Sequence, residues 1–162
     1  MKILGIDPGT RVAGFCIMQV QANGSILLLE AGCLLLSEKD TMQRRLRNIY
    51  DFFDTLLKSQ NIQSIALETP FLGKNAHNFL KLGYVRAIIY LLSDIHTVGL
   101  HEYAPREVKK ALTGSGSAEK DQVGRVVRAL FPQIATKKIR DDVTDAIAIS
   151  FCGALRQKGG HF

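Results

Sequence analysis

The stretch ILGIDPGTRVAGFCIMQVQANGSILLLEAGCLLL, residues 3–36, decides the fold class. Its first apolar run ends at Asp7 and is followed by a Pro-Gly pair, which is typical of a turn. Two further runs, residues 12–20 and 26–36, are apolar and partly β-branched. They flank Asn23-Gly24, a dipeptide that strongly favours a β-hairpin. The stretch therefore predicts three neighbouring antiparallel strands.

Beyond this meander, helices and strands alternate. Apolar spacing predicts strands over residues 62–68 and 97–103, and helices over residues 37–60, 75–93, 105–112, 117–130 and 142–155. Ser37 and Ser117 are expected to cap their helices. Leu130 is expected to face inward, and the basic residues 131–140 are expected to be irregular. Strands followed by β-α-β units imply an α/β fold, a mixed sheet with helices on its faces. We expect one domain over residues 1–158 and a flexible tail over 159–162.

Charge is distributed unevenly along the 162 residues. The formal net charge is +6, and residues 106–140 hold nine Lys and Arg against three Asp and Glu. Such asymmetry indicates a face that meets a polyanion. No membrane-spanning run and no signal-peptide pattern is expected, and the three scattered cysteines are typical of a cytosolic protein.

Four acidic residues stand where chemistry is expected. Asp7 and Glu68 end apolar strands, and strand ends are where such sheets meet ligands. Asp142 and Asp145 are spaced i,i+3, so a helix places their β-carbons roughly 5–6 Å apart on one face. Asp145 is expected on the apolar side of that helix, where an unpaired carboxylate is costly. Two divalent cations about 3.5–4 Å apart between these acids would activate a water against a phosphodiester.

Each acid also has an ordinary interpretation. Asp7 is explained equally by a turn, Glu68 by a strand-end surface position and Asp142 by a helix N-cap. Asp145 is the hardest of the four to explain in this way. The segment from Asp7 to Thr10 also resembles the phosphate-binding segment of sugar kinases, actin and chaperone ATPases, which need two such domains where this chain has length for one.

Several ordered motifs extend over nearly the whole chain. They are ILGIDPGTRVAG (3–14), Glu68 followed by FLGKNA (71–76), LKLG (80–83), EYAPREVK (102–109), GSGSAEKDQV (114–123) and DVTDA (142–146). Together they resemble the RuvC-type Holliday-junction resolvases. The resemblance implies a ribonuclease-H-like fold, a mixed five-stranded sheet flanked by helices. It also implies a homodimeric endonuclease that makes paired symmetric nicks in strands of like polarity, leaving 5′-phosphate and 3′-hydroxyl ends.

The resemblance also assigns roles to individual residues. The catalytic and metal-binding carboxylates are then Asp7, Glu68, Asp142 and Asp145, the same four that spacing selects. Lys109 and Lys120 match functional lysines near the active site, and Phe71 matches an aromatic that stacks on opened bases. On the bare sequence these lysines are solvated helix charges and Phe71 an edge-of-core residue. The expected DNA-binding set is Phe71, Lys74, Asn75, Arg106, Lys109, Lys110 and Lys120.

Cofactors and partners follow from the same likeness. It implies two Mg²⁺ ions per active site, for which Mn²⁺ can substitute, and four-way junction DNA as the substrate. It also implies dimerisation through the helix 75–93 and the RuvA–RuvB branch-migration complex as a partner. No membrane contact and a cytoplasmic location are expected. Gly153 departs from the family, many members of which carry a His there. Two alternatives stay open: a non-catalytic junction-binding module and a nucleotide-phosphate enzyme of the actin-like class.

Overall fold

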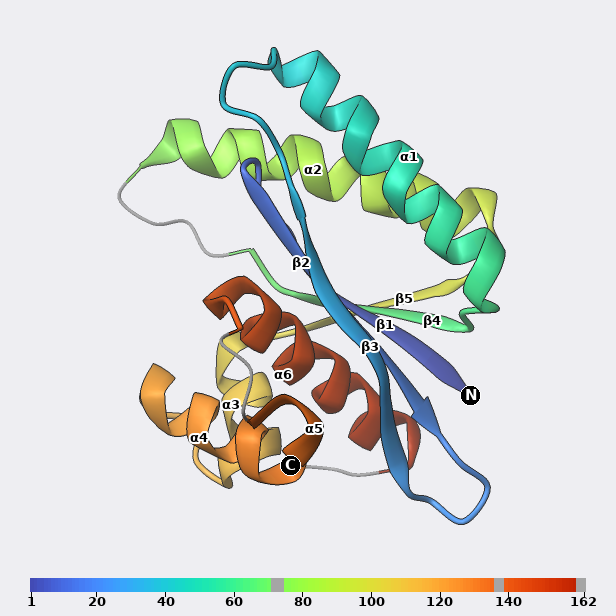
Figure 1. Ribbon diagram of the computed structural model, residues 1–162, viewed down its shortest axis with the longest axis vertical. Helices are drawn as coiled ribbons and strands as arrows, with labels where there is room; N and C mark the ends of the chain where they lie inside the picture. The colour runs from blue at the N-terminus through green and yellow to red at the C-terminus, as the bar shows by residue number, and fades with distance from the viewer. Residues whose placement is uncertain (71–74, 136–138, 160–162) are drawn as a thin grey trace.

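The computed structural model describes residues 1–70, 75–135 and 139–159, and its centre is a five-stranded sheet (Figure 1). The strands are β1 (Lys2–Asp7), β2 (Val12–Val20), β3 (Ile26–Leu35), β4 (Ser64–Glu68) and β5 (Gly99–Tyr103), in the order β3-β2-β1-β4-β5. β1, β2 and β3 form the antiparallel meander that the sequence predicts, whereas β4 and β5 run parallel to β1. The mixed sheet is thus confirmed.

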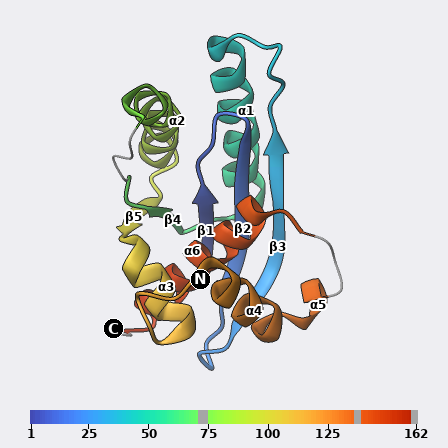
Figure 2. The ribbon, with the colours of Figure 1, turned by 90° about the vertical axis from the view of Figure 1, so that its left-hand side faces the viewer.

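Helices cover both faces of this sheet. They are α1 (Met42–Gln60), α2 (Ala76–Ile95), α3 (Pro105–Thr113), α4 (Lys120–Leu130), α5 (Pro132–Ala135) and α6 (Asp141–Gln157). Figure 2 shows α1 and α2 at one end of the view and α3, α4 and α5 at the other, around α6. None of the described helices has the length and apolarity needed to cross a membrane.

Two hydrophobic clusters lie on opposite sides of the sheet. Because side chains alternate along a strand, Leu4 and Ile6 pack with α1 and α2, whereas Ile3 packs with α6. The contact with α6 is close, since a β-carbon on Gly5 would lie 2.5 Å from the backbone nitrogen of Ser150. Helix α6 is therefore held directly against β1. This close contact fixes the first turns of α6 over the end of β1.

The start of α1 differs from the sequence prediction. The N-cap is Thr41, whose Oγ1 accepts a hydrogen bond from the backbone N–H of Arg44 at 3.3 Å. Ser37 was expected in that role, but its Oγ instead accepts from the N–H of Lys39 at 3.2 Å, within a turn. The prediction for Ser37 is wrong because a hydroxyl can cap a local turn as well as a helix.

The segment around α4 differs too. Helix α4 begins after Glu119 and not at Ser117, whose hydroxyl lies 3.0 Å from that of Ser115 in the preceding loop. Leu130 is 45% exposed and does not face the core. Within the basic segment expected to be irregular, residues 132–135 form the short helix α5. Most of the expected flexible tail, residues 160–162, lies outside the described residues.

Candidate active site

The four predicted carboxylates gather at one edge of the sheet. Asp7 and Glu68 are the last residues of β1 and β4, which are parallel neighbours with Ile6 opposite Leu67. Asp142 and Asp145 lie in the first two turns of α6. Figure 2 views the molecule from this side, with α6 lying against β1 and β2. The fold therefore joins three segments that are far apart in sequence.

Burial and mutual repulsion dominate the electrostatics of this cluster. Burial raises the pKa of Asp7 to about 7, with further contributions from the charges of Asp145, Asp142 and Glu68. Burial is also the main cause that raises the pKa of Glu68 and of Asp145. These carboxyl groups are close enough to disfavour one another's ionised forms, so their full ionisation requires a compensating positive charge.

The donor set fits a hard divalent cation. Carboxylate oxygens are the ligands that Mg²⁺ and Mn²⁺ prefer. Among the described residues, no three Asp, Glu, His or Cys side chains converge closely enough to hold one ion as they stand. The carboxylates are thus close enough to influence one another's ionisation, but their oxygen atoms do not surround a common metal-binding position. A divalent cation would relieve the repulsion that, after burial, raises the pKa of Asp7.

Two lysines lie beside the carboxylates, where the resemblance predicts them. Lys120, the first residue of α4, has its Nζ 3.2 Å from Oδ2 of Asp145 and 3.3 Å from Oδ2 of Asp141. Lys109 of α3 lines a cleft of about 250 Å³ together with Lys120, Glu68 and Asp145. The acidic cluster therefore has cationic side chains along the wall that α3 and α4 form.

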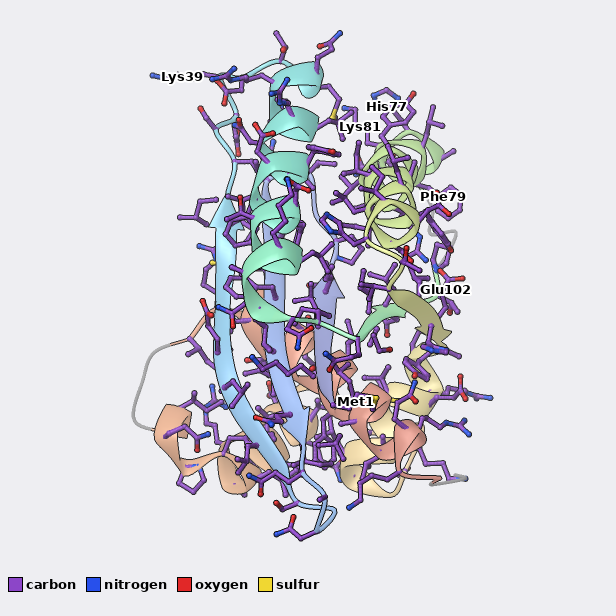
Figure 3. All side chains as sticks on the ribbon, turned by 90° about the vertical axis from the view of Figure 1, so that its right-hand side faces the viewer. Met1, Lys39, His77, Phe79, Lys81 and Glu102 are labelled. Atoms are coloured by element: carbon purple, nitrogen blue, oxygen red, sulfur yellow. The ribbon has the colours of Figure 1, made fainter. Side chains whose placement is uncertain are left out.

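The opposite wall comes from α2 and the loop after β4. A second cleft, of about 200 Å³, lies between Asp7, Glu68, Pro70, Phe79 and Arg86. Figure 3 labels Phe79 on α2. Neither Phe79 nor Arg86 was predicted from the sequence to be a site residue.

The position of Arg86 within an apolar helical stripe of the sequence could have identified it. It sits among Val85, Ile89 and Leu92, the buried stripe of α2, and is itself buried. A charged residue within an apolar helical stripe requires a partner inside the fold. No comparable signal marks Phe79, because an aromatic at helical spacing is ordinary core.

The loop after β1 is also anchored. Arg45 of α1 donates from its Nη1 to the carbonyl oxygen of Thr10 at 3.2 Å, and from its Nε to the carbonyl oxygen of Asp40 at 3.1 Å. These bonds tie the turn that follows Asp7 to the start of α1. The turn is therefore held in place from outside the sheet.

Several predicted DNA-binding residues lie away from the carboxylates or outside the described residues. Phe71 and Lys74 lie outside the described residues. Asn75 is the N-cap of α2, where its Oδ1 accepts from the N–H of Asn78 at 3.1 Å. Arg106 and Lys110 line a separate cleft on α3, together with Gly116 and Ser117. These two exposed side chains extend the basic surface beyond the carboxylate cluster.

Gly153 proves to be a packing position. It is buried in α6, and a β-carbon there would lie 3.0 Å from Cβ of Ala66 and 3.6 Å from Cε2 of Tyr103. The residue faces the sheet about 12 Å along the helix from Asp145. The departure from the family pattern therefore leaves the four carboxylates unaffected.

Fold and site together define a class of protein. The mixed sheet has the strand order β3-β2-β1-β4-β5. Carboxylates lie at the ends of β1 and β4 and on α6, the helix packed across these strands. This is the arrangement of a ribonuclease-H-like nuclease. The family model described as crossover junction endodeoxyribonuclease RuvC matches residues 3–153. The chain belongs to the RuvC family.

Individual relatives agree with this assignment. The crossover junction endodeoxyribonuclease RuvC of Chlorobium phaeobacteroides is 39% identical over 96% of this chain and 82% of its own length, and that of Prosthecochloris aestuarii is 41% identical over 99% and 85%. The structure of Thermus thermophilus RuvC superimposes with a TM-score of 0.85 at 24% identity, covering 98% of this chain and 97% of the other. At that identity the superposition shows the fold. The expected ribonuclease-H-like fold and RuvC-type enzyme class are confirmed.

Proposed function

We propose that this protein resolves Holliday junctions in DNA recombination and repair by nicking two strands of like polarity. The observation that carries this proposal is the cluster of Asp7, Glu68 and Asp145 with Lys120 at 3.2 Å from Asp145. A thermophilic relative with a TM-score of 0.84 is described in complex with Holliday junction substrate. The paired nicks would leave 5′-phosphate and 3′-hydroxyl ends that a ligase can seal.

RuvC enzymes are metal-dependent nucleases, and the ion and its stoichiometry are part of the proposal. We assign two Mg²⁺ ions per site, with Mn²⁺ as a substitute, to the four carboxylates. Asp7 would contact both ions, an assignment that the electrostatic effect of Asp145, Asp142 and Glu68 on its carboxyl group supports. When bound, such a pair supplies an activated water and a charge that stabilises the leaving oxygen.

The protein's own groups orient and neutralise the phosphate. Lys120 and Lys109 line the cleft beside Glu68 and Asp145, so a phosphodiester seated there meets two ammonium groups. Charge that grows on the phosphate oxygens in the transition state is stabilised by such fixed cations. We assign Lys120 the larger role because its Nζ already lies at the carboxylate of Asp145.

Helix α2 offers a surface for a second copy of the chain. Apart from Tyr90, its exposed large apolar side chains are Leu80, Tyr84, Leu91 and Ile95, which are 42–53% exposed. They recur at helical spacing along one face, and this face is distinct from the buried stripe. A two-fold dimer through α2 would present two identical sites to a junction of similar symmetry.

The remaining assignments concern DNA and its context. Phosphate contacts position a protein on DNA, and we assign them to Arg106, Lys109, Lys110 and Lys120, with Lys74 and Asn75 near the crossover and Phe71 stacking on opened bases. We further propose that residues 1–158 form one domain, that the enzyme works with the RuvA–RuvB branch-migration complex, and that it acts in the cytoplasm.

A junction-cleavage assay tests the function. Wild type and Asp7→Asn are incubated with a labelled four-way junction and Mg²⁺ or Mn²⁺, beside Asp51→Asn as a control. Asp51 is an exposed acid of α1 that pairs with Arg47, so its loss leaves the site intact. We expect paired nicks from wild type and the control, and junction binding without cutting from Asp7→Asn. Equal cutting by all three proteins contradicts the proposal, and binding without cutting by wild type favours a non-catalytic module.

A further inference from the structure

Arg86 is a buried arginine at the active-site edge of α2. Its side chain is 8% exposed, and it is the one charged residue that the described part of the chain buries so fully. The side chain lines the cleft that contains Asp7, Glu68 and Phe79. A guanidinium buried in this way must be matched by acceptors inside the fold.

The acceptors belong to two neighbouring strands. Nη1 of Arg86 donates to the backbone carbonyl oxygen of Glu68 at 2.8 Å, and Nη2 forms an ion pair with Glu102 of β5. Glu102 lies opposite Leu67 in the parallel β4–β5 pair, one residue before the end of the ladder. Figure 3 shows Glu102 on β5, close to α2. One planar side chain thus ties the ends of both strands to the helix.

Stability alone gives little reason to keep this arrangement. Replacing a buried ion pair by apolar side chains of similar size is often neutral or stabilising, because the desolvation cost offsets the attraction. Arg86 does, however, bond to the residue whose carboxylate belongs to the site. The guanidinium fork fixes two directions at once, which a single ammonium group cannot do.

We propose that Arg86 is a positioning residue for the nuclease reaction. By holding the carbonyl group of Glu68, it fixes the last residue of β4, so that the Glu68 carboxylate stays aligned with Asp7 and Asp145. The inference rests on the proposed function for its catalytic readout. It also makes the placement of Glu68 depend on α2, whose opposite face carries the exposed side chains Tyr84 and Leu91.

The test compares Arg86→Met, Arg86→Lys and Glu102→Gln with a control at the C-terminal end of the same helix. The control is His96→Gln, because Nε2 of His96 lies 2.8 Å from Oδ1 of Asp54 in a half-buried pair that joins α2 to α1. His96 is about 15 Å along the helix from Arg86. Junction cleavage gives kcat and KM, calorimetry gives Mg²⁺ affinity without junction, and thermal unfolding gives Tm.

The expected pattern separates positioning from simple stability. Arg86→Met should lower kcat and Mg²⁺ affinity roughly 10–100-fold while KM for the junction changes about twofold or less. Arg86→Lys should recover part of both losses, and Glu102→Gln should lose less than Arg86→Met because the bond to Glu68 remains. His96→Gln should lower Tm and leave kcat and Mg²⁺ affinity at wild-type values.

Two results overturn the inference. One is an Arg86→Met protein with wild-type kcat and Mg²⁺ affinity, and the other is a loss that His96→Gln reproduces at a similar Tm. If Arg86→Met does not fold, the same comparison is made with Arg86→Lys and Glu102→Gln. If wild type binds Mg²⁺ but cuts no junction, the proposed function fails, and the calorimetric comparison still decides whether Arg86 positions Glu68.

Discussion

Gly14 of β2 lies directly beneath the backbone of Asp142, so that a β-carbon on Gly14 would come within 2.0 Å of the Asp142 carbonyl oxygen. Gly14 is also the residue opposite Asp7 in the β1–β2 pair. The absence of a side chain at this one position therefore lets α6 approach the sheet where β1 ends. Asp142 is brought to Asp7 by a backbone contact that only glycine permits.

Gly14→Ala should consequently disturb the fold and the site together. The added methyl group meets backbone, which cannot move aside cheaply, so we expect a loss of about 1–3 kcal/mol in the free energy of unfolding. Urea unfolding measures this loss, and the cleavage assay should show reduced cutting. The control is Gly83→Ala in α2, where the new β-carbon would meet nothing within 4 Å beyond its chain neighbours and the backbone of its own helix. An alanine there should stabilise the helix by about 0.5–1 kcal/mol, and equal stability of both variants would contradict the argument.

Asp7→Asn should stabilise the metal-free protein at neutral and alkaline pH. The pKa of Asp7 is raised from 3.8 to about 7, chiefly by burial. Because the folded-state pKa lies above the unfolded value, Asp7 destabilises the fold progressively as pH rises from about 4 to about 7, and fully above that. Three pKa units correspond to about 4 kcal/mol. We therefore expect a gain on the order of 3 kcal/mol at pH 8 in the presence of a chelator.

The same comparison near pH 4 is the internal control for Asp7→Asn. Asp7 is protonated in the folded wild type there and about half protonated in the unfolded one, so most of the penalty is absent and the urea midpoints of the two proteins should nearly coincide. Asp51→Asn should show no such gain at pH 8, since Asp51 is exposed and paired with Arg47. A wild type more stable than Asp7→Asn at pH 8 without metal would show that the cluster is not electrostatically strained.

Divalent metal should reverse the order of stability. Ligands that bind only the folded state stabilise it by about 2.7 kcal/mol at 100 times the dissociation constant. We expect Mg²⁺ or Mn²⁺ to raise the Tm of wild type, and to raise that of Asp7→Asn or Asp145→Asn much less. Thermal unfolding across a metal titration measures the difference. A common rise in all three proteins would place the ion elsewhere.

The sequence predicts the features that depend on neighbours along the chain. The hairpin follows from Asn23-Gly24 between apolar runs, and Asp7 and Glu68 are selected because each ends an apolar strand. Asp145 is selected because helical spacing places it on an apolar side, and burial of that carboxyl group raises its pKa in the structure. Local pattern therefore suffices to predict the strands and to select the acids as candidates.

Features that depend on contacts across the fold are not predictable in this way. The hydroxyl groups of Ser37 and Thr41 are both able to cap a helix, and in the fold that of Thr41 caps α1 whereas that of Ser37 caps a turn. Arg86 finds its acceptors on β4 and β5, strands that meet α2 only after folding. Lys120 reads as a solvated charge in the sequence, and its place beside Asp145 follows from how α4 docks on α6.

Leu91→Glu should dissociate the proposed dimer. Leu91 is 50% exposed on α2, between Tyr84 and Ile95, and a carboxylate there would be buried against a like charge in a two-fold interface. Light scattering should show a monomer, and cleavage should lose the pairing of nicks. Leu29→Glu is the control, since Leu29 is 43% exposed on β3, away from α2. A monomeric wild type, or a dimeric Leu91→Glu protein, contradicts the assignment of the interface.

Lys120→Ala should separate cutting from binding. Its Nζ lies 3.2 Å from Asp145, so it would act at the proposed cleavage site, where loss of one such cation costs roughly 10²–10³ in kcat. Lys110 is the matched control because it is exposed on α3 and lines a cleft with Arg106 rather than with the carboxylates. Lys110→Ala should weaken junction binding and leave kcat unchanged. The slope of log binding constant against log salt concentration should fall by about one, as expected for the loss of one phosphate contact. If excess protein restores full cutting to Lys120→Ala, Lys120 serves only to bind DNA.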